Sequence, residues 1–395
     1  MDQSGGGGGT DWRRPCAVAA VAMLGVILAL TLVPTGGPGP SGFQWHLYSG
    51  EFGLSDFICN ELLFVPLAVA LCCSGVPAWK TVALGLVLST TIEFAQLRVV
   101  PGRDSSLSDI FSNTIGAALG VALVLWLPGR RRSALRAVAA AAASLAVIAA
   151  TGLVLRPSFP ATHWYGQWTA NLGQYEWYRG KVLSAEIGVL PLPSWRLADT
   201  RAVRELLDAG AALHVRAVAG PRTERLAPLF SIYDSRQREI LLVGPDGEDL
   251  VLHVRSRAED VLLRPTELRW HRALTGVAPG DTLAVSIRRE PSGYCLGANG
   301  HERCGLSFTA GEAWALFQSF PGLVPAAQAL LDCLVMFLLG IPVGLVTARR
   351  GWGWAGLAVA LAGAVVVPPL VGLAPTPLLQ LAALALGVIA ARRAP

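Results

Sequence analysis

A seven-residue pattern, Leu-Ser-Asp-x-x-x-Asn, occurs twice in the sequence and opens a long apolar run each time. The first copy holds Asp56 and Asn60, and the second holds Asp109 and Asn113. Residues four positions apart share one face of a helix. A carboxylate and a carboxamide are costly at membrane depth unless they face protein or water, so such residues inside membrane helices usually have a function. The two pairs are therefore the first candidates for a site.

The apolar run between the two copies carries another polar pair near its end. Glu93 and Gln96 are three residues apart on one helix face, and the following loop contains Arg103 and Asp104. A carboxylate such as Glu93 could act as a general base, with Arg103 binding an anion or neutralising buried carboxylates. These groups could also serve only as helix-to-helix hydrogen bonds, each contributing about 0.6 kcal/mol. Because no nucleophile or metal-ligand spacing accompanies them, we expect binding rather than catalysis, without a cofactor or metal.

The elements that must position these residues are membrane helices. The chain is 53% hydrophobic and only 15% charged, which is typical of a membrane protein. Several apolar runs approach the roughly 20 residues that cross a bilayer. We predict eight spans, at residues 16–34, 56–74, 80–97, 107–127, 136–155, 325–346, 353–373 and 377–391.

The basic residues that give the chain its net charge of +5 are clustered at certain ends of the predicted spans. Basic clusters precede the first span and follow the fourth, sixth and eighth, which places both termini in the cytoplasm by the positive-inside rule. We therefore expect membrane lipids as partners and no nucleic acid. With this topology the candidate residues meet at one level near the outer face of the membrane. We call them the rim cluster: Asp56, Asn60, Glu93, Gln96, Arg103, Asp109 and Asn113.

Small and kink-forming residues predict how these spans pack. Gly116 and Gly120 continue the face of Asp109 and Asn113 and form a surface for close helix approach. Pro66 interrupts the second span, where a kink would free backbone carbonyls. The doubled motif suggests a repeated two-helix hairpin with a parallel pseudo-two-fold axis.

The ordered set of motifs resembles the VanZ-like family over residues 16–155. The motifs that carry the resemblance are Asp56-x-x-x-Asn60 with Leu63-Phe64-x-Pro66, Ile92-Glu93-x-x-Gln96, Arg103, and Asp109-x-x-x-Asn113-x-x-Gly116-x-x-x-Gly120. The resemblance implies a bacterial envelope protein linked to reduced susceptibility to the glycopeptide teicoplanin. It supplies no catalytic assignment.

Residues 157–320 interrupt the membrane pattern with short β-type runs separated by turns, which predicts an antiparallel β-sandwich. We expect strands at 182–190, 212–218, 227–233, 239–243, 249–255, 282–288, 293–297 and 305–308. Topology places this domain outside the cytoplasm, where Cys295 and Cys304 are expected to form a disulfide across a hairpin. The four residues His163, Trp164, Tyr165 and Trp168 favour an aromatic belt at the membrane interface over a sugar-stacking platform.

The stretch from Leu229 to Arg255 resembles a concanavalin A-like, laminin-G-like jelly roll, which implies glycan or protein binding. No calcium site is identified there, because Asp234, Asp246 and Asp249 are expected to be turn residues. In the last spans, Asp332 is the polar residue most worth testing, with Gln328 beside it.

The predicted fold is thus a membrane α-helical bundle of about eight helices with an inserted all-β domain. The predicted domains are a tail at 1–15, a five-helix VanZ-like bundle at 16–155, an extracytoplasmic sandwich at 156–323 and a three-helix region at 324–395. We expect a protein of the bacterial cytoplasmic membrane that binds a lipid-linked or glycan envelope component. The alternatives are an intramembrane enzyme modifying a lipid or cell-wall precursor at the outer leaflet, and a scaffold that recruits an envelope protein through the sandwich.

Overall fold

The computed structural model describes residues 13–34, 42–45, 52–126, 133–173, 175–320, 323–347 and 354–393. The predicted tail at 1–15 lies almost entirely outside these residues. The chain divides into two compact units, Met1–Arg131 and Arg132–Pro395, and each is described by itself.

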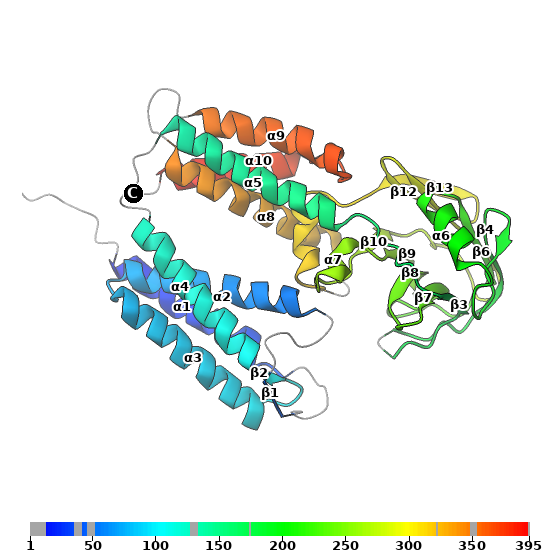
Figure 1. Ribbon diagram of the computed structural model, residues 1–395, viewed down its shortest axis with the longest axis horizontal. Helices are drawn as coiled ribbons and strands as arrows, with labels where there is room; N and C mark the ends of the chain where they lie inside the picture. The colour runs from blue at the N-terminus through cyan, green and yellow to red at the C-terminus, as the bar shows by residue number, and fades with distance from the viewer. Residues whose placement is uncertain are drawn as a thin grey trace, which may run out of the picture. The chain divides into compact units, whose positions relative to one another are not determined.

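The first unit is helical (Figure 1). It holds α1 (Arg13–Leu32), α2 (Gly53–Cys73), α3 (Ala78–Arg98) and α4 (Leu107–Trp126), with two short parallel strands, β1 (Phe43–Gln44) and β2 (Ser105–Ser106). Helix α2 packs along α4, while α1 packs on α2 and α3 packs on α4. An apolar cluster that includes Ile27, Phe64 and Ile92 joins α1, α2 and α3.

The second unit contains four further apolar helices: α5 (Ala134–Val154), α8 (Pro325–Val346), α9 (Ala355–Val371) and α10 (Leu378–Arg393). Helix α8 packs on α10, and α5 packs on both α8 and α9. The Ser144 hydroxyl donates to the Leu339 carbonyl at 2.8 Å, and Gly356 lies against Ala137. Helix α5 thus lies with the second unit, whereas we predicted it as the fifth helix of the first bundle.

Helices occupy all eight predicted span positions. Within the described residues, five of them, α1, α2, α4, α5 and α8, are long and apolar enough to cross a membrane. Helices α9 and α10 are apolar but shorter. Helix α3 matches its neighbours in length but includes Lys80, Glu93 and Arg98, so its crossing, and the total of eight spans, remain predictions.

Two antiparallel sheets form the β domain between α5 and α8. One has the strand order β10-β9-β8-β7-β3, with β3 (Trp164–Trp168), β7 (Phe230–Asp234), β8 (Glu239–Asp246), β9 (Asp249–Val254) and β10 (Glu267–Trp270). The other has the order β13-β12-β11-β6-β4-β5, with β4 (Lys181–Ile187), β5 (Leu190–Pro191), β6 (Leu213–Val218), β11 (Thr282–Glu290), β12 (Gly293–Ala298) and β13 (His301–Leu306). Two short helices, α6 (Thr200–Asp208) and α7 (Arg257–Asp260), and a 3-10 helix, η1 (Gly311–Leu316), complete the unit.

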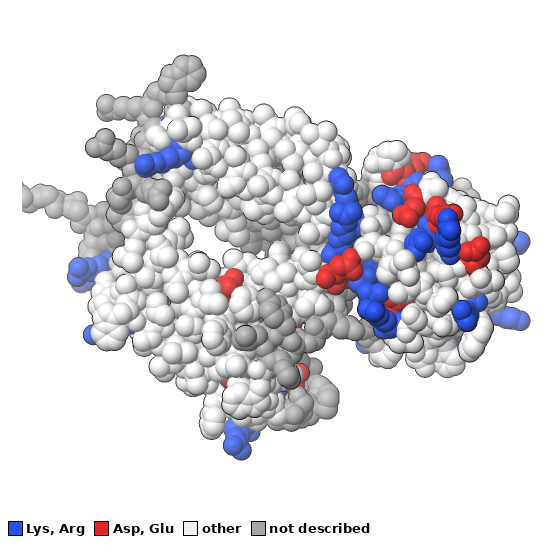
Figure 2. All heavy atoms as spheres, viewed as in Figure 1, with Lys and Arg blue, Asp and Glu red and all other residues white. Residues whose placement is uncertain are grey.

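Alternating side chains build the core between the two sheets. In β6, Leu213, Val215 and Ala217 are buried in a cluster with residues of the other sheet such as Leu241 and Leu252. In contrast to the helices, the β domain carries many Lys, Arg, Asp and Glu side chains on its surface (Figure 2).

The disulfide between Cys295 and Cys304 is present and joins β12 to β13, as predicted. The aromatic belt prediction is wrong for Trp164, which is fully buried in the core of the β domain. Its indole N–H donates to the Pro160 carbonyl at 3.1 Å. The stretch forms strand β3 because its backbone pairs with β7, which fixes the alternate side chains inward.

Candidate functional site

The two copies of the repeated motif begin α2 and α4 and meet each other. Asp56 lies in the first turn of α2, and Asp109 lies in the first turn of α4, where a carboxylate is favoured by the helix dipole. The Asn60 amide donates to the Asp109 carboxylate at 2.8 Å. The asparagine of the first copy therefore binds the aspartate of the second copy.

Helix α3 adds a buried carboxylate beside the start of α4. Glu93 is only 3% exposed, and its Oε2 accepts the Ser106 backbone N–H at 2.7 Å. One turn earlier in α3, the Ser89 hydroxyl accepts the Asn113 amide at 2.9 Å. Glu93 and Ser89 thus bind the loop before α4 and the face of α4 that carries Asp109.

Arg103 does not act as the counter-ion that the sequence suggested. Its Nη2 donates to the Leu30 carbonyl at 2.7 Å, and its Nε donates to the Val33 carbonyl at 3.2 Å. Gln96 likewise donates to the Thr31 carbonyl at 3.0 Å. The last carbonyls of a helix have no intrahelical donor, and a cation there also complements the helix dipole. Arg103 and Gln96 therefore bind the end of α1 and not the carboxylates.

The structure thus divides the rim cluster into two groups. Asn60, Glu93, Asp109 and Asn113 form one network through Ser89 and Ser106, and Asp56 lies exposed near its edge. The Oδ1 atom of Asn113 and the Oε1 atom of Gln96 are buried and have no hydrogen-bond partner among the described residues. The network therefore presents mainly acceptors.

Two serines of this network were not among the predicted residues. The Ser106 hydroxyl accepts the Asp109 backbone N–H at 3.1 Å and so caps α4. Ser106-Leu107-Ser108-Asp109 has the spacing of a capping-box motif, which could have identified Ser106 from the sequence. Ser89 precedes Glu93 by one helical turn, but no comparable motif marks it.

The predicted glycine surface on α4 is in close contact with α2. A Cβ atom on Gly116 would overlap the carbonyl oxygen of Glu61, and one on Gly120 would lie 2.6 Å from that of Val65. Pro66 lies inside α2. This close approach brings Asn60 within hydrogen-bond distance of Asp109.

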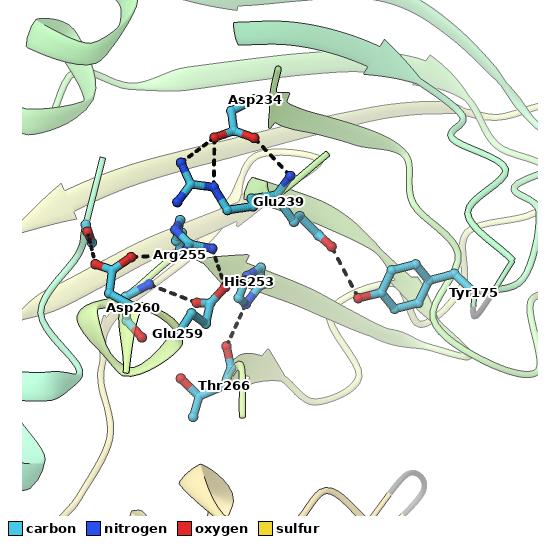
Figure 3. Close-up of polar contacts among 11 residues, drawn as sticks. Tyr175, Asp234, Glu239, His253, Arg255, Glu259, Asp260 and Thr266 are labelled. Carbon is cyan, nitrogen blue, oxygen red and sulfur yellow. Dashed lines mark hydrogen bonds and ion pairs between the residues drawn. The ribbon is translucent and has the colours of Figure 1, made fainter. Parts of the chain in front are cut away.

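A second polar cluster lies within the β domain, around Arg255 (Figure 3). Arg255 is 5% exposed and binds both carboxylates of α7: its Nη1 lies 3.2 Å from Glu259 and its Nη2 lies 2.9 Å from Asp260. Asp260 also accepts the Ser158 hydroxyl at 2.6 Å. Because Ser158 follows closely after α5, this cluster ties α7 to the end of a membrane helix.

A buried histidine faces the same carboxylates (Figure 3). The Nδ1 atom of His253 lies 3.0 Å from the Thr266 carbonyl and must donate to it, and Nε2 lies 3.7 Å from Glu259 Oε2. Burial by itself would lower the pKa of His253, but the carboxylates of Glu239, Glu259 and Glu267 outweigh burial, and the pKa is raised. Burial raises the pKa of Glu239. The surrounding carboxylates thus favour the protonated form of His253 more than water would.

The aspartates that were expected in turns are the end residues of strands β7, β8 and β9, and the protein's own groups bind them. Asp234 accepts the backbone N–H groups of Arg236 and Arg238 and the guanidinium of Arg238. Burial would raise its pKa, but these hydrogen bonds and the charge of Arg238 lower it. Asp249 accepts from the backbone of Arg272 in the same way.

The polar residues of α8 bind η1. The Trp314 indole donates to Asp332 at 2.7 Å, and Gln328 donates to Glu312 at 3.2 Å. Gln380 of α10 accepts the Gly311 backbone N–H at 3.2 Å. Asp332, the residue of the last spans that the sequence singled out, therefore helps to dock η1. Helices α8 and α10 together hold this segment where the chain leaves the β domain.

Comparison with known proteins gives one match. The family model for VanZ/LLP1 matches residues 20–128, which include every member of the rim cluster. No curated protein and no solved structure matches the chain. Together with the apolar helices, the family match identifies a multi-pass membrane protein that carries a VanZ/LLP1 domain at residues 20–128.

Proposed function

We propose that the VanZ/LLP1 domain binds a lipid-linked or glycan component of the bacterial envelope through the rim cluster. The observation that carries this proposal is the pairing of two acids, Glu93 and Asp109, which, within the part of the chain that the structure describes, bind neutral donors from Ser106 and Asn60. Arg103 is engaged at the end of α1. An acceptor-rich site that holds two acidic side chains in a membrane helix bundle is costly to maintain, which supports a role in binding.

The arrangement of acceptors indicates the chemistry of the ligand. Among the described residues, the buried oxygen atoms Asn113 Oδ1 and Gln96 Oε1 have no donor, and the two acids beside them add further acceptor oxygens. A ligand with ammonium or hydroxyl groups would supply the donors. We therefore favour an amine- or hydroxyl-bearing headgroup over a phosphate.

Binding without turnover is the better interpretation of the same contacts. The hydroxyl groups of Ser89 and Ser106 are occupied, because Ser89 accepts from Asn113 and Ser106 caps α4 at Asp109. A serine held in this way is a structural group and not an activated nucleophile. Reduced susceptibility to teicoplanin-type glycopeptides would follow from sequestering an envelope component.

The β domain is proposed to lie outside the cytoplasm and to bind a glycan polymer or an envelope protein. The disulfide Cys295–Cys304 supports an oxidising compartment. The domain is inserted between α5 and α8, two helices that pack together, and this supports a location of both its ends on the same side of the membrane. The concanavalin A-like, laminin-G-like resemblance supports this role.

The experiment compares Glu93→Gln and Asp109→Asn with a surface control, Glu205→Gln, whose side chain is 61% exposed on α6. We expect the first two variants to lose co-purifying envelope lipids, measured by native mass spectrometry, and to lose any glycopeptide phenotype of the expressing strain. The control should retain both. Unchanged lipid binding and phenotype in the two rim variants, at equal expression, would refute the proposal.

A further inference from the structure

The turn that follows α7 exposes two adjacent apolar side chains on the surface of the β domain. Val261 is 46% exposed and Leu262 is 36% exposed. Leu262 has a φ of 62°, which is uncommon for a bulky side chain. The Leu263 N–H donates to the Ala258 carbonyl at 2.9 Å and closes the turn. Backbone strain of this kind often accompanies function.

Residues 257–264, which comprise α7 and the turn after it, are called the α7 turn. Hydrogen bonds hold the α7 turn beside the ends of two membrane helices. The Arg257 N–H donates to the Arg156 carbonyl at 3.0 Å, and Arg156 lies two residues beyond the last residue of α5, Val154. Two residues span at most about 7 Å. On the other side, the Arg264 N–H donates to the Leu316 carbonyl at 3.0 Å, in the segment that leads to α8.

Both α5 and α8 are long and apolar enough to cross a membrane. The α7 turn must therefore lie close to the level at which α5 leaves the bilayer. Phe320 and Val324, just before α8, are also exposed, at 47% and 61%. Exposed apolar residues at this level meet lipid headgroups and not bulk water.

The charges around the turn favour anionic lipid. Arg156 and Arg257 are exposed, while the neighbouring acids Glu259 and Asp260 are ion-paired with Arg255. Figure 2 shows Lys and Arg side chains gathered around α7, with acidic side chains beside them. Exposed arginines next to apolar side chains form the pattern of an interfacial membrane-binding segment.

We propose that the α7 turn binds the surface of the bilayer. Val261 and Leu262 insert between the headgroups, and Arg156 and Arg257 bind the phosphate groups of anionic phospholipid. This surface is separate from the rim cluster, and the proposal does not depend on the function of that cluster.

The test places a spin label at Leu262→Cys in the full-length chain, with Cys16, Cys59, Cys72, Cys73 and Cys333 replaced by alanine. The matched control label is Val189→Cys, which lies in the turn between β4 and β5 and is 92% exposed. Collision rates with oxygen and with a water-soluble nickel chelate are measured in vesicles of phosphatidylcholine, with or without phosphatidylglycerol. The label at 262 should collide with oxygen more and with nickel less than the label at 189. Equal nickel accessibility at both positions would overturn insertion.

A second arm tests the arginines. Arg156→Gln with Arg257→Gln should cancel the extra immersion that phosphatidylglycerol gives to the label at 262, since each arginine near an anionic surface contributes about fivefold in partitioning. Arg201→Gln, an exposed arginine of α6, is the control and should leave the immersion unchanged. Immersion that does not depend on phosphatidylglycerol or on these arginines would overturn phosphate binding.

If the chain without its five free cysteines does not fold, hydrogen exchange of the unmodified protein in nanodiscs replaces the spin-label measurement. Slower exchange of residues 257–264 with phosphatidylglycerol than without it supports the proposal, and identical exchange contradicts it.

Discussion

Replacing Arg255 by methionine should destabilise the β domain far more than the same change at Arg201. Both arginines pair with a glutamate four residues later, but the side chains of Arg255 and Glu259 are 6% and 12% exposed, whereas those of Arg201 and Glu205 are 80% and 61% exposed. The two pairs therefore differ in burial and not in spacing, which makes Arg201→Met a matched control.

The magnitude follows from what each substitution leaves behind. Without Arg255, the nearly buried Glu259 loses its guanidinium partner, and removing one partner of a buried pair costs about 3–5 kcal/mol. Asp260 is 40% exposed and can turn to water, so it adds little. An exposed pair contributes about 0.3–0.5 kcal/mol. With a urea dependence of roughly 1–3 kcal/mol per molar, the unfolding midpoint should fall by at least ~1 M for Arg255→Met and by less than ~0.5 M for Arg201→Met.

Pulse proteolysis of the full-length protein in urea measures this midpoint, because cleavage within the β domain reports its unfolding. The double variant Arg255→Met, Glu259→Gln should recover part of the loss, since the carboxylate that Arg255 paired with is then removed as well. The reasoning fails if Arg255→Met and Arg201→Met shift the midpoint equally, or if the second substitution adds a further loss.

Three further outcomes are expected. Gly116→Ala should lower the stability of the helix bundle by about 1–3 kcal/mol, because its Cβ would overlap a carbonyl of α2. Gly25→Ala should not, because nothing lies within 4 Å of its Cβ position. The unfolding midpoints of the two variants in mixed detergent micelles measure the difference. Because the pKa of His253 is raised, its contribution to the free energy of unfolding is full below pH about 6.5 and is lost as the pH rises through the folded-state pKa. Urea midpoints measured between pH 5 and 9 should therefore fall for the native chain and fall less for His253→Gln. Parallel curves for the two chains would contradict this. Removing the Cys295–Cys304 bridge, which closes a loop of separation 9, should cost about 3 kcal/mol, measured as a lower urea midpoint; a midpoint equal to that of the native chain would contradict it.

The helices were predictable because length and hydropathy determine them, but their partners were not. All eight predicted spans have helices, since each apolar run is bounded by segments that contain Gly, Pro or Arg. The assignment of α5 to the first bundle used only its place in the chain. In the structure its small residues Ala137 and Ala141 pack in the second unit, with Ala137 against Gly356. Small residues permit close packing, but they do not specify which helix approaches.

The candidate site was predictable to the extent that helical spacing determines it. Spacing placed Asp56 with Asn60 and Asp109 with Asn113 on one helix face each, and the expected topology placed both pairs and Glu93 at one level. The contact between Asn60 and Asp109 was not predicted. The partner of Arg103 was not predictable, because it is a set of backbone carbonyls at the end of α1. Every residue has a carbonyl, so sequence offers carboxylates as the visible partners of an arginine.

The buried cluster of the β domain depends on strand pairing that the sequence did not show. Glu267 lies opposite His253 only because β10 pairs with β9, and β10 was not among the predicted strands. Strand β3 was missed because an aromatic-rich segment beside a membrane helix fits an interfacial belt equally well. In both cases tertiary pairing, and not local propensity, decided the structure.

The contacts of α7 link two of the experiments above. The Arg255 cluster holds α7 to Ser158 and the end of α5, and the same helix leads into the apolar turn at Leu262. If Arg255 positions that turn at the bilayer, then Arg255→Met, studied below its unfolding midpoint, should make a spin label at position 262 more accessible to the water-soluble nickel chelate. A label at position 189 should be unaffected, because its turn lies on the other sheet. A destabilised β domain with an unchanged label at 262 would show that the buried ion pairs serve folding alone, and that other contacts, such as those of Arg264 with η1 and Phe317, are sufficient to hold the turn at the membrane.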